Sequence, residues 1–192
     1  MSSPQFRHLE FGVTRIERRE AAHGVCYVKA ENALPEPPVS LVERMAHWVQ
    51  VQPDQTFMAR RAAPAQAGQA RGDWQHLTYA QAWAQGRSIA QALIDRGLSV
   101  DRPVVILSEN SLEHALMALG SMIAGVPFVP TSPPYSLISQ DYDKLKHVLR
   151  TVTPGLVFAS DAARYGKAIL ATVGHDVEVV LAEGKLDPTR AV

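Results

Sequence analysis

The chain has 192 residues, of which 46% are hydrophobic and 20% are charged. This composition can bury a substantial core and excludes a disordered polar tail. The 19 Lys and Arg residues are balanced by 19 Asp and Glu residues, so we expect no nucleic-acid partner, because proteins that bind phosphate backbones carry a basic excess. The single cysteine, Cys26, permits no internal disulfide, and neither a signal peptide nor a membrane-spanning run is found. We therefore expect a soluble, cytoplasmic protein with no membrane partner.

The first part of the chain, residues 1–38, is predicted to form an arm. Two short β-branched segments, Phe11–Arg19 and Val25–Lys29, flank a possible turn at Ala21–Gly24, which is the pattern of a β-hairpin. The proline-rich segment 34–39 then indicates an extended linker. We place the domain boundary there, with an incomplete α/β subdomain over residues 39–192.

The compact part begins with helix-start signals. Ser40 and Glu43 match a capping box before a helix, and Thr78 and Gln81 match a second one. Between these helices the sequence predicts a strand over Thr56–Arg60 and an exposed loop or hairpin tip over Ala62–Gln75. The second helix is predicted to stop at Gly97.

From Pro103 onward, apolar strands alternate with amphipathic helices. A helix capped by Asn110 or Ser111 is expected to run through Ala124, where Gly125 ends it. The continuous apolar runs are typical of strands buried on both faces, so the fold class is α/β, with a mostly parallel sheet flanked by helices. The predicted strands are Pro103–Leu107, Val126–Val129, Leu156–Ala159 and Val177–Leu181, and the later helices are Ser139–Thr151 and Ala162–Thr172.

The common signatures of nucleotide or metal sites are missing from the sequence. Neither a Gly-x-Gly-x-x-Gly nor a Gly-x-x-x-x-Gly-Lys-Ser/Thr loop occurs, and no two histidines have metal-ligand spacing. Gly120 is read as a site of close helix packing. His114 follows a strand's carboxyl end, which favours either a site or local hydrogen bonding. Cys26 is expected to be inert, in an apolar strand without an activating cation.

The carboxyl ends of the predicted strands are the place where a site is expected. Three loops, Ser108–Ser111, Pro130–Ser136 and Ser160–Arg164, should gather at one edge of the sheet, where ligands bind in open α/β folds. Their donors, together with Arg164 and Lys167, suit an anionic ligand. The same residues are equally compatible with ordinary helix capping and a solvated charged helix.

Several blocks of the sequence resemble the adenylate-forming acyl- and aryl-CoA synthetases. The first is Leu77–Trp83 with the helix ending in Ala92–Leu98 and the segment Asp101–Ser111, and the second is Ala118–Pro130. The stretch Ser132–His147 is most similar to feruloyl-CoA synthase. The resemblance covers roughly residues 35–185 and implies the N-terminal subdomain of the acyl-CoA synthetase fold.

The resemblance implies an ATP-dependent ligase in the parent enzyme. A hydroxycinnamate, an aromatic acid, would react with ATP and Mg²⁺ to give an acyl-adenylate and pyrophosphate, and CoA would then displace AMP. In related enzymes the turn after the second block and a following basic residue approach the nucleotide end of CoA. The matching positions here are Pro134, Tyr135 and Ser136 for the turn and Arg164 or Lys167 for the cation, whereas the resemblance carries no catalytic or metal-binding residue onto this chain.

The family's phosphate loop, its nucleotide motifs and its catalytic lysine do not occur in the 192 residues. We therefore expect an opening fragment that is inactive by itself, binds no cofactor tightly, and self-associates through surface meant for the missing part. The alternative is a stand-alone, non-catalytic α/β binding or interaction module. The reading frame after Val192 discriminates between them.

Overall fold

The computed structural model describes residues 15–62 and 72–186. The chain divides into two compact units, Met1–Val39 and Ser40–Val192, and each is described by itself. Across the described ranges, no helix has the length and apolar character needed to cross a membrane.

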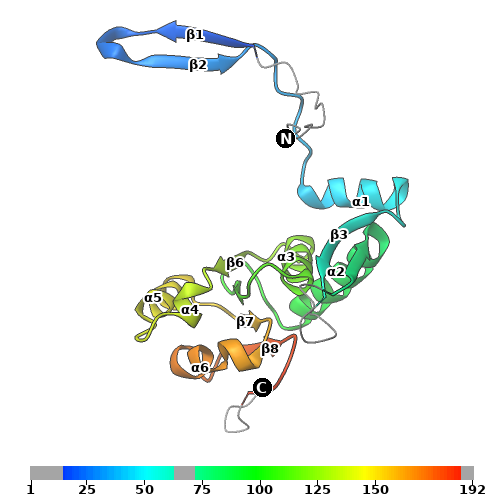
Figure 1. Cartoon of the computed structure of the whole chain (residues 1–192), viewed down its shortest axis with the longest axis vertical. Helices are drawn as coiled ribbons and strands as arrows, with labels where there is room; N and C mark the ends of the chain where they lie inside the picture. The colour runs from blue at the N-terminus through cyan, green and yellow to red at the C-terminus, as the bar shows by residue number, and fades with distance from the viewer. Residues whose placement is uncertain (1–14, 63–71, 187–192) are drawn as a thin grey trace, which may run out of the picture. The chain divides into compact units, whose positions relative to one another are not determined.

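The first unit contains an antiparallel hairpin of β1 (Ile16–Glu20) and β2 (Cys26–Ala30), joined by the short 3₁₀ turn η1 (Ala22–Gly24) (Figure 1). The turn takes positive φ at His23 and Gly24. The first strand extends one residue beyond the predicted end at Arg19, and positions 11–14 of the predicted strand lie outside the described residues.

The surroundings predicted for Cys26 differ from the structure in two respects, and its predicted inertness stays a prediction. The side chain is exposed rather than enclosed in an apolar strand, and the Arg18 guanidinium lies against it, with Nε donating to Sγ at 3.2 Å. The register explains the contact, because residues 18 and 26 lie on the same face of the hairpin.

The second unit is built on a four-stranded parallel sheet in the order β6-β5-β7-β8. Its strands are β5 (Val104–Leu107), β6 (Phe128–Thr131), β7 (Leu156–Ala159) and β8 (Glu178–Leu181). All four residues of β5 and of β7 are buried, as expected for strands covered on both faces. The predicted α/β class is confirmed.

Helices cover both faces of this sheet, and each face has its own apolar core (Figure 1). Val104 and Ile106 pack with residues of α2 (Tyr79–Asp95) and α3 (Leu112–Ala124). Val105 and Leu107 point to the opposite face and pack with α5 (Asp143–Val152) and α6 (Ala162–Thr172). The alternation of β5 side chains thus joins the two layers.

Side-chain caps fix where the helices begin. Ser40 Oγ accepts the Glu43 N–H at 3.1 Å at the start of α1 (Leu41–Val51). The predicted capping box of α2 is complete, because Thr78 Oγ1 accepts the Gln81 N–H at 3.2 Å and Gln81 Oε1 accepts the Thr78 N–H at 3.0 Å. Ser111 caps α3, which ends at left-handed Gly125 with φ 69°.

The α2 and α3 helices cross closely at two glycines, as predicted for Gly120. A Cβ atom built on Gly120 would lie 2.4 Å from Ile89 Cγ2, and one on Gly86 would lie 3.0 Å from Leu119 Cδ2. Separations this short are far inside van der Waals contact between carbons. The absence of side chains at these two positions therefore permits the crossing.

Three other predictions differ from the structure. A strand, β4 (Trp74–Thr78), pairs with β3 (Thr56–Arg61) and overlaps the end of the loop or hairpin tip predicted over residues 62–75, of which 63–71 lie outside the described residues. The strand β6 begins two residues later than predicted. A short helix, α4 (Pro134–Leu137), occupies part of the predicted loop 130–136, as Pro at the first helical position allows.

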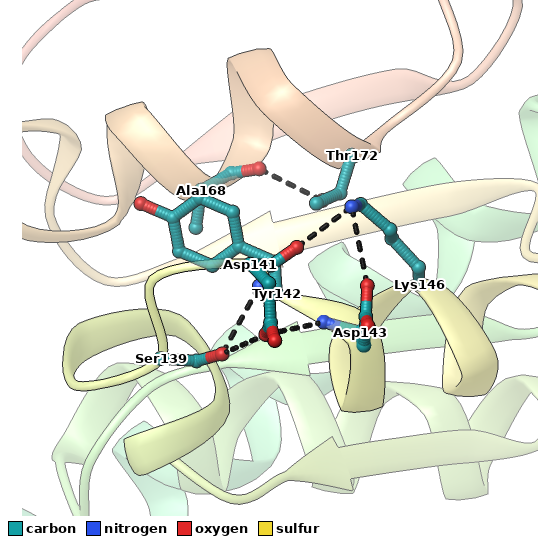
Figure 2. A network of polar contacts seen from close by, with 7 residues as sticks. All are labelled: Ser139, Asp141, Tyr142, Asp143, Lys146, Ala168 and Thr172. Carbon is teal, nitrogen blue, oxygen red and sulfur yellow. Dashed lines mark hydrogen bonds and ion pairs between the residues drawn. The ribbon is translucent and has the colours of Figure 1, made fainter.

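The helix α5 begins at Asp143 instead of Ser139 because polar side chains hold the preceding turn (Figure 2). Ser139 Oγ accepts the Tyr142 N–H at 3.0 Å, and Asp141 Oδ1 accepts the Asp143 N–H at 3.1 Å. Lys146 Nζ donates to the Asp141 carbonyl at 2.7 Å. Tyr142, predicted inside the helix, takes a left-handed conformation with φ 55° at its N-cap. These hydrogen bonds from side chains to the backbone replace the backbone bonds that an earlier helix start would need, so α5 begins after the turn.

Candidate functional site

The parallel register brings the predicted loops to one edge of the sheet. Leu107 at the end of β5 pairs with Thr131 of β6 and with Ala159 of β7. The loops that follow these three strands therefore begin side by side. The chain leaves β5 toward α3 on one face and leaves β7 toward α6 on the other, which makes the gap between them the point where ligands bind in open α/β sheets.

Two of the three loops line an open cleft of about 610 Å³. Its walls contain hydroxyl, amide, carboxylate and imidazole groups. The lining residues are Ser108, Glu109, Asn110, His114, Pro130, Thr131, Ser132 and Pro133.

The third loop is joined to the first by an ion pair between Arg164 and Glu109. Nη1 of Arg164 donates to Glu109 Oε2, and both side chains are about half exposed. The hydrogen bond from Arg164 lowers the pKa of the Glu109 carboxyl, and the same bond raises the pKa of the guanidinium. Solvent screens the attraction at this exposure. The pair spans the gap between β5 and β7 and positions Arg164 at the rim.

The turn residues Pro134, Tyr135 and Ser136 all lie in α4, which packs against α6. Pro134 is exposed, Tyr135 is half-buried, and the Lys144 ammonium lies 5.4 Å from the centre of the Tyr135 ring. Ser136 is buried, and its Oγ has no hydrogen-bond partner among the described residues.

Arg164 and Lys167 both lie on α6, three residues apart and exposed. Residues at this spacing lie on neighbouring positions of a helix surface. The structure thus brings the predicted turn and the predicted cations onto two helices in contact. It also shows that Glu109 neutralises part of the Arg164 charge, which the sequence did not indicate.

Two buried polar atoms in the cleft lack a partner within the part of the chain that the structure describes. They are Nδ1 of His114 and Oγ1 of Thr131. The His114 backbone N–H donates to Ser111 Oγ at 3.1 Å, so local bonding engages the backbone and not the ring nitrogen. Buried polar atoms ordinarily have partners, which marks both residues as candidate ligand contacts. Thr131 belongs to the predicted loop Pro130–Ser136, although the sequence did not single it out as a binding residue.

Tyr165 is fully buried behind Arg164, and its hydroxyl also lacks a hydrogen-bond partner among the described residues. Burial raises the pKa of its phenol, so the group stays neutral. Within the described ranges, no three His, Cys, Asp or Glu side chains are grouped to hold a metal ion.

Comparisons with known proteins identify the family of the chain. The sequence model of one family, described as AMP-binding enzyme, matches residues 45–191. Among curated proteins, surfactin synthase subunit 2 of Bacillus subtilis (strain 168) is 39% identical over 61 residues, which are 32% of this chain and 2% of that protein. Malpinin synthetase of Mortierella alpina is 30% identical over 90 residues, 47% of this chain and 1% of that protein.

Solved structures share the fold at low sequence identity. A fatty acid AMP ligase from Legionella pneumophila aligns over 74% of this chain and 23% of its own, with a TM-score of 0.58 and 19% identity. An AMPPNP-bound nonribosomal peptide synthetase, FmoA3, aligns over 82% of this chain and 15% of its own, with a TM-score of 0.58 and 20% identity. The chain thus spans a quarter or less of these relatives, and its fold matches the N-terminal domain of adenylate-forming ligases. The chain belongs to the AMP-binding enzyme family.

Proposed function

We propose that the chain forms the N-terminal subdomain of an ATP-dependent acid–thiol ligase of the feruloyl-CoA synthase type. Its reaction would convert a hydroxycinnamate, ATP and CoA into the acyl-CoA, AMP and pyrophosphate. Membership of the AMP-binding enzyme family supports the adenylate-forming step. The resemblance of Ser132–His147 to feruloyl-CoA synthase supports the aromatic acid and CoA as substrates. The observation that carries the site is the contact between α4 and α6 at the carboxyl edge of the sheet.

The reaction has two displacement steps. The acid's carboxylate oxygen attacks the α-phosphorus of ATP, and pyrophosphate leaves with the electrons of the broken P–O bond. The CoA thiolate then attacks the acyl carbonyl, and AMP leaves. Mg²⁺ neutralises phosphate charge in such transfers. We assign no step through Mg²⁺ to this chain, because its described residues offer no cluster of metal ligands.

The contribution of this chain is to bind the nucleotide end of CoA. Arg164 and Lys167 supply positive charge for phosphate groups at the rim, and a guanidinium fixed in orientation suits phosphate oxygens. Glu109 already pairs with Arg164 in the structure. A phosphate that takes over this guanidinium must therefore compete with the carboxylate.

The reaction is tested by ferulate-dependent ATP–pyrophosphate exchange with the complete product of the gene that encodes this chain. A panel of ferulate, a long-chain fatty acid and an amino acid separates the three acid classes. We expect exchange with ferulate, and no exchange by residues 1–192 alone, which have no glycine-rich phosphate loop. Exchange with the fatty acid or amino acid but not with ferulate refutes the proposed substrate. Absence of exchange with every acid favours the non-catalytic module.

The site is tested by replacing Arg164 and Lys167 together with alanine. We expect the KM for CoA to rise while ferulate-dependent exchange stays near the wild-type value, because only the second step uses CoA. The matched control is Arg150→Ala, which removes an exposed cation from α5. A fall in exchange with an unchanged KM for CoA shows that the two cations serve the adenylation step instead.

A further inference from the structure

The hairpin of β1 and β2 has an unused hydrogen-bonding edge on β2. The Ala21 N–H donates to the Val25 carbonyl and the Glu31 N–H donates to the Arg15 carbonyl. Hydrogen-bonded and non-hydrogen-bonded pairs alternate along an antiparallel ladder, so every second pair between these two positions is hydrogen-bonded. Residues 25, 27 and 29 therefore bond toward β1. The N–H and C=O groups of Cys26, Val28 and Ala30 point to the other side, where β2 pairs with no strand among the described residues.

Within the described part of the first unit, the side chains of this hairpin are also uncovered. Every residue of both strands is exposed, including Ile16 at 58%, Tyr27 at 53% and Val28 at 61%. A two-stranded hairpin is marginally stable by itself, and three or more strands are needed for independent stability. An open edge with apolar side chains is a template for pairing with another strand.

We propose that this edge pairs with the same edge of a second copy of the chain. The two β2 strands would run antiparallel about a two-fold axis at Val28 and make one four-stranded sheet, ordered β1-β2-β2-β1. An isologous contact of this kind closes as a dimer. The proposal is independent of the ligase reaction, since it uses only residues of the first unit.

The parity of the hydrogen bonds fits this symmetric register. Val28 points its backbone groups outward, so Val28 facing the partner's Val28 forms a hydrogen-bonded pair. Cys26 facing the partner's Ala30 forms another on each side of the axis. A two-fold axis at Tyr27 or Lys29 would also join outward-pointing residues in hydrogen-bonded pairs, so the facing side chains decide the register. An axis at Lys29 places that lysine opposite its own copy, and like charges directly opposite are destabilising. An axis at Tyr27 brings no second cation to the Tyr27 ring.

The side chains that this register brings together are complementary. Tyr27 faces the partner's Lys29, and the same contact is repeated across the axis. Arg19 already lies 4.7 Å from the centre of the Tyr27 ring, so Lys29 adds a second cation–π contact to each ring. Val28 meets its own copy, a β-branched pair suited to a sheet.

The outer edge of β1 does not offer the same match. Its outward-pointing residues are Ile16, Arg18 and Glu20, by the same alternation. A two-fold axis at Glu17, Arg18 or Arg19 places that charged residue opposite its own copy, and like charges directly opposite are destabilising. The charge pattern therefore favours β2 as the pairing edge.

Proline substitution on the two edges tests the proposal, because the hairpin's own ladder does not use the N–H of Val28 or of Arg18. We expect the wild-type chain to elute with twice the monomer mass in light scattering at micromolar concentration. Val28→Pro should halve that mass, and the matched Arg18→Pro should leave it unchanged. A monomeric wild type, or a dimeric Val28→Pro, overturns the proposal. In the second case the dimer uses another surface.

A cross-linking pair decides the case in which both proline variants are monomers. In the Cys26→Ser background, Val28→Cys places two thiols on the axis, with Cα atoms about 5.5 Å apart, inside the range of about 4.4–6.8 Å for a disulfide. Arg18→Cys lies directly across the hairpin from it and is the control. Selective oxidation of the Val28→Cys variant to a covalent dimer supports the proposal, and equal or absent cross-linking overturns it.

Discussion

The crossing of α2 and α3 should be sensitive to a single methyl group. In Gly120→Ala the added Cβ would lie 2.4 Å from Ile89 Cγ2, 2.7 Å from Ile89 Cβ and 3.1 Å from the Gly86 carbonyl oxygen. Carbon atoms prefer separations of about 3.5–4.0 Å, so the helices must move apart by roughly 1 Å or Ile89 must leave its rotamer.

The expected change in the free energy of unfolding caused by Gly120→Ala follows from two opposing effects. Overpacking of this kind costs about 1–3 kcal/mol, and replacing Gly with Ala inside a helix returns about 1 kcal/mol. The branched carbons of Ile89 cannot swing away as the end of a flexible side chain can, which places the cost near the upper end. We therefore expect Gly120→Ala to lower the free energy of unfolding by about 1–2 kcal/mol.

The assay is urea unfolding followed by far-ultraviolet circular dichroism. The matched control is Gly166→Ala in α6, where the new Cβ meets only Leu186 Cδ2 among the described residues, at 3.2 Å, and the substitution should be neutral or slightly stabilising. Ile89→Ala in the Gly120→Ala background should cost less than Ile89→Ala in the wild type, because it relieves the clash. A Gly120→Ala protein as stable as the wild type refutes the close crossing.

Two further predictions concern local hydrogen bonds. Thr78→Ala removes the acceptor of the Gln81 N–H and should lower the free energy of unfolding by about 0.5–2 kcal/mol; Thr78→Ser should restore it in thermal denaturation, and loss in both variants contradicts the cap. The Asp143 N–H and then the Ser139 hydroxyl lower the pKa of Asp141, so Ser139→Ala should raise that pKa toward 3.8, as read by NMR titration of the carboxyl carbon. A carboxyl pKa that is lower in the folded state than in the unfolded state stabilises the folded state at pH values above the unfolded pKa. The contribution of Asp141 to stability should therefore be lost as the pH falls through its folded pKa. A pKa of Asp141 that Ser139→Ala leaves unchanged contradicts the network.

The sequence predicted those parts of the fold that depend on local signals. Ser111 and Gly125 mark both ends of α3 because capping chemistry involves only neighbouring residues. The strand β4 was missed because Trp74–Thr78 follows an Ala-, Gln- and Gly-rich run and buries only Leu77 within the strand. The early start predicted for α5 was wrong, since helical periodicity does not reveal side chains that bond a turn instead.

The candidate site was predictable in position but not in its contacts. Alternating strands and helices are enough to place the loops after β5, β6 and β7 at one edge. The pairing of Glu109 with Arg164 joins residues 55 positions apart, and the unpartnered Oγ1 of Thr131 depends on the packing around it. Neither property leaves a periodic or motif-like trace in the sequence.

The central position of β5 has a consequence for synthesis on the ribosome. Both of its neighbours come later in the chain, since Val104 pairs with Phe128 on one side and with Leu156 on the other. This buried strand is therefore synthesised before either partner strand, and its pairing is complete only after β7 has been synthesised. A nascent chain stopped before residue 156 would leave one whole edge of β5 unpaired, and such edges promote aggregation. Chaperone protection during this interval should therefore raise the yield of the protein.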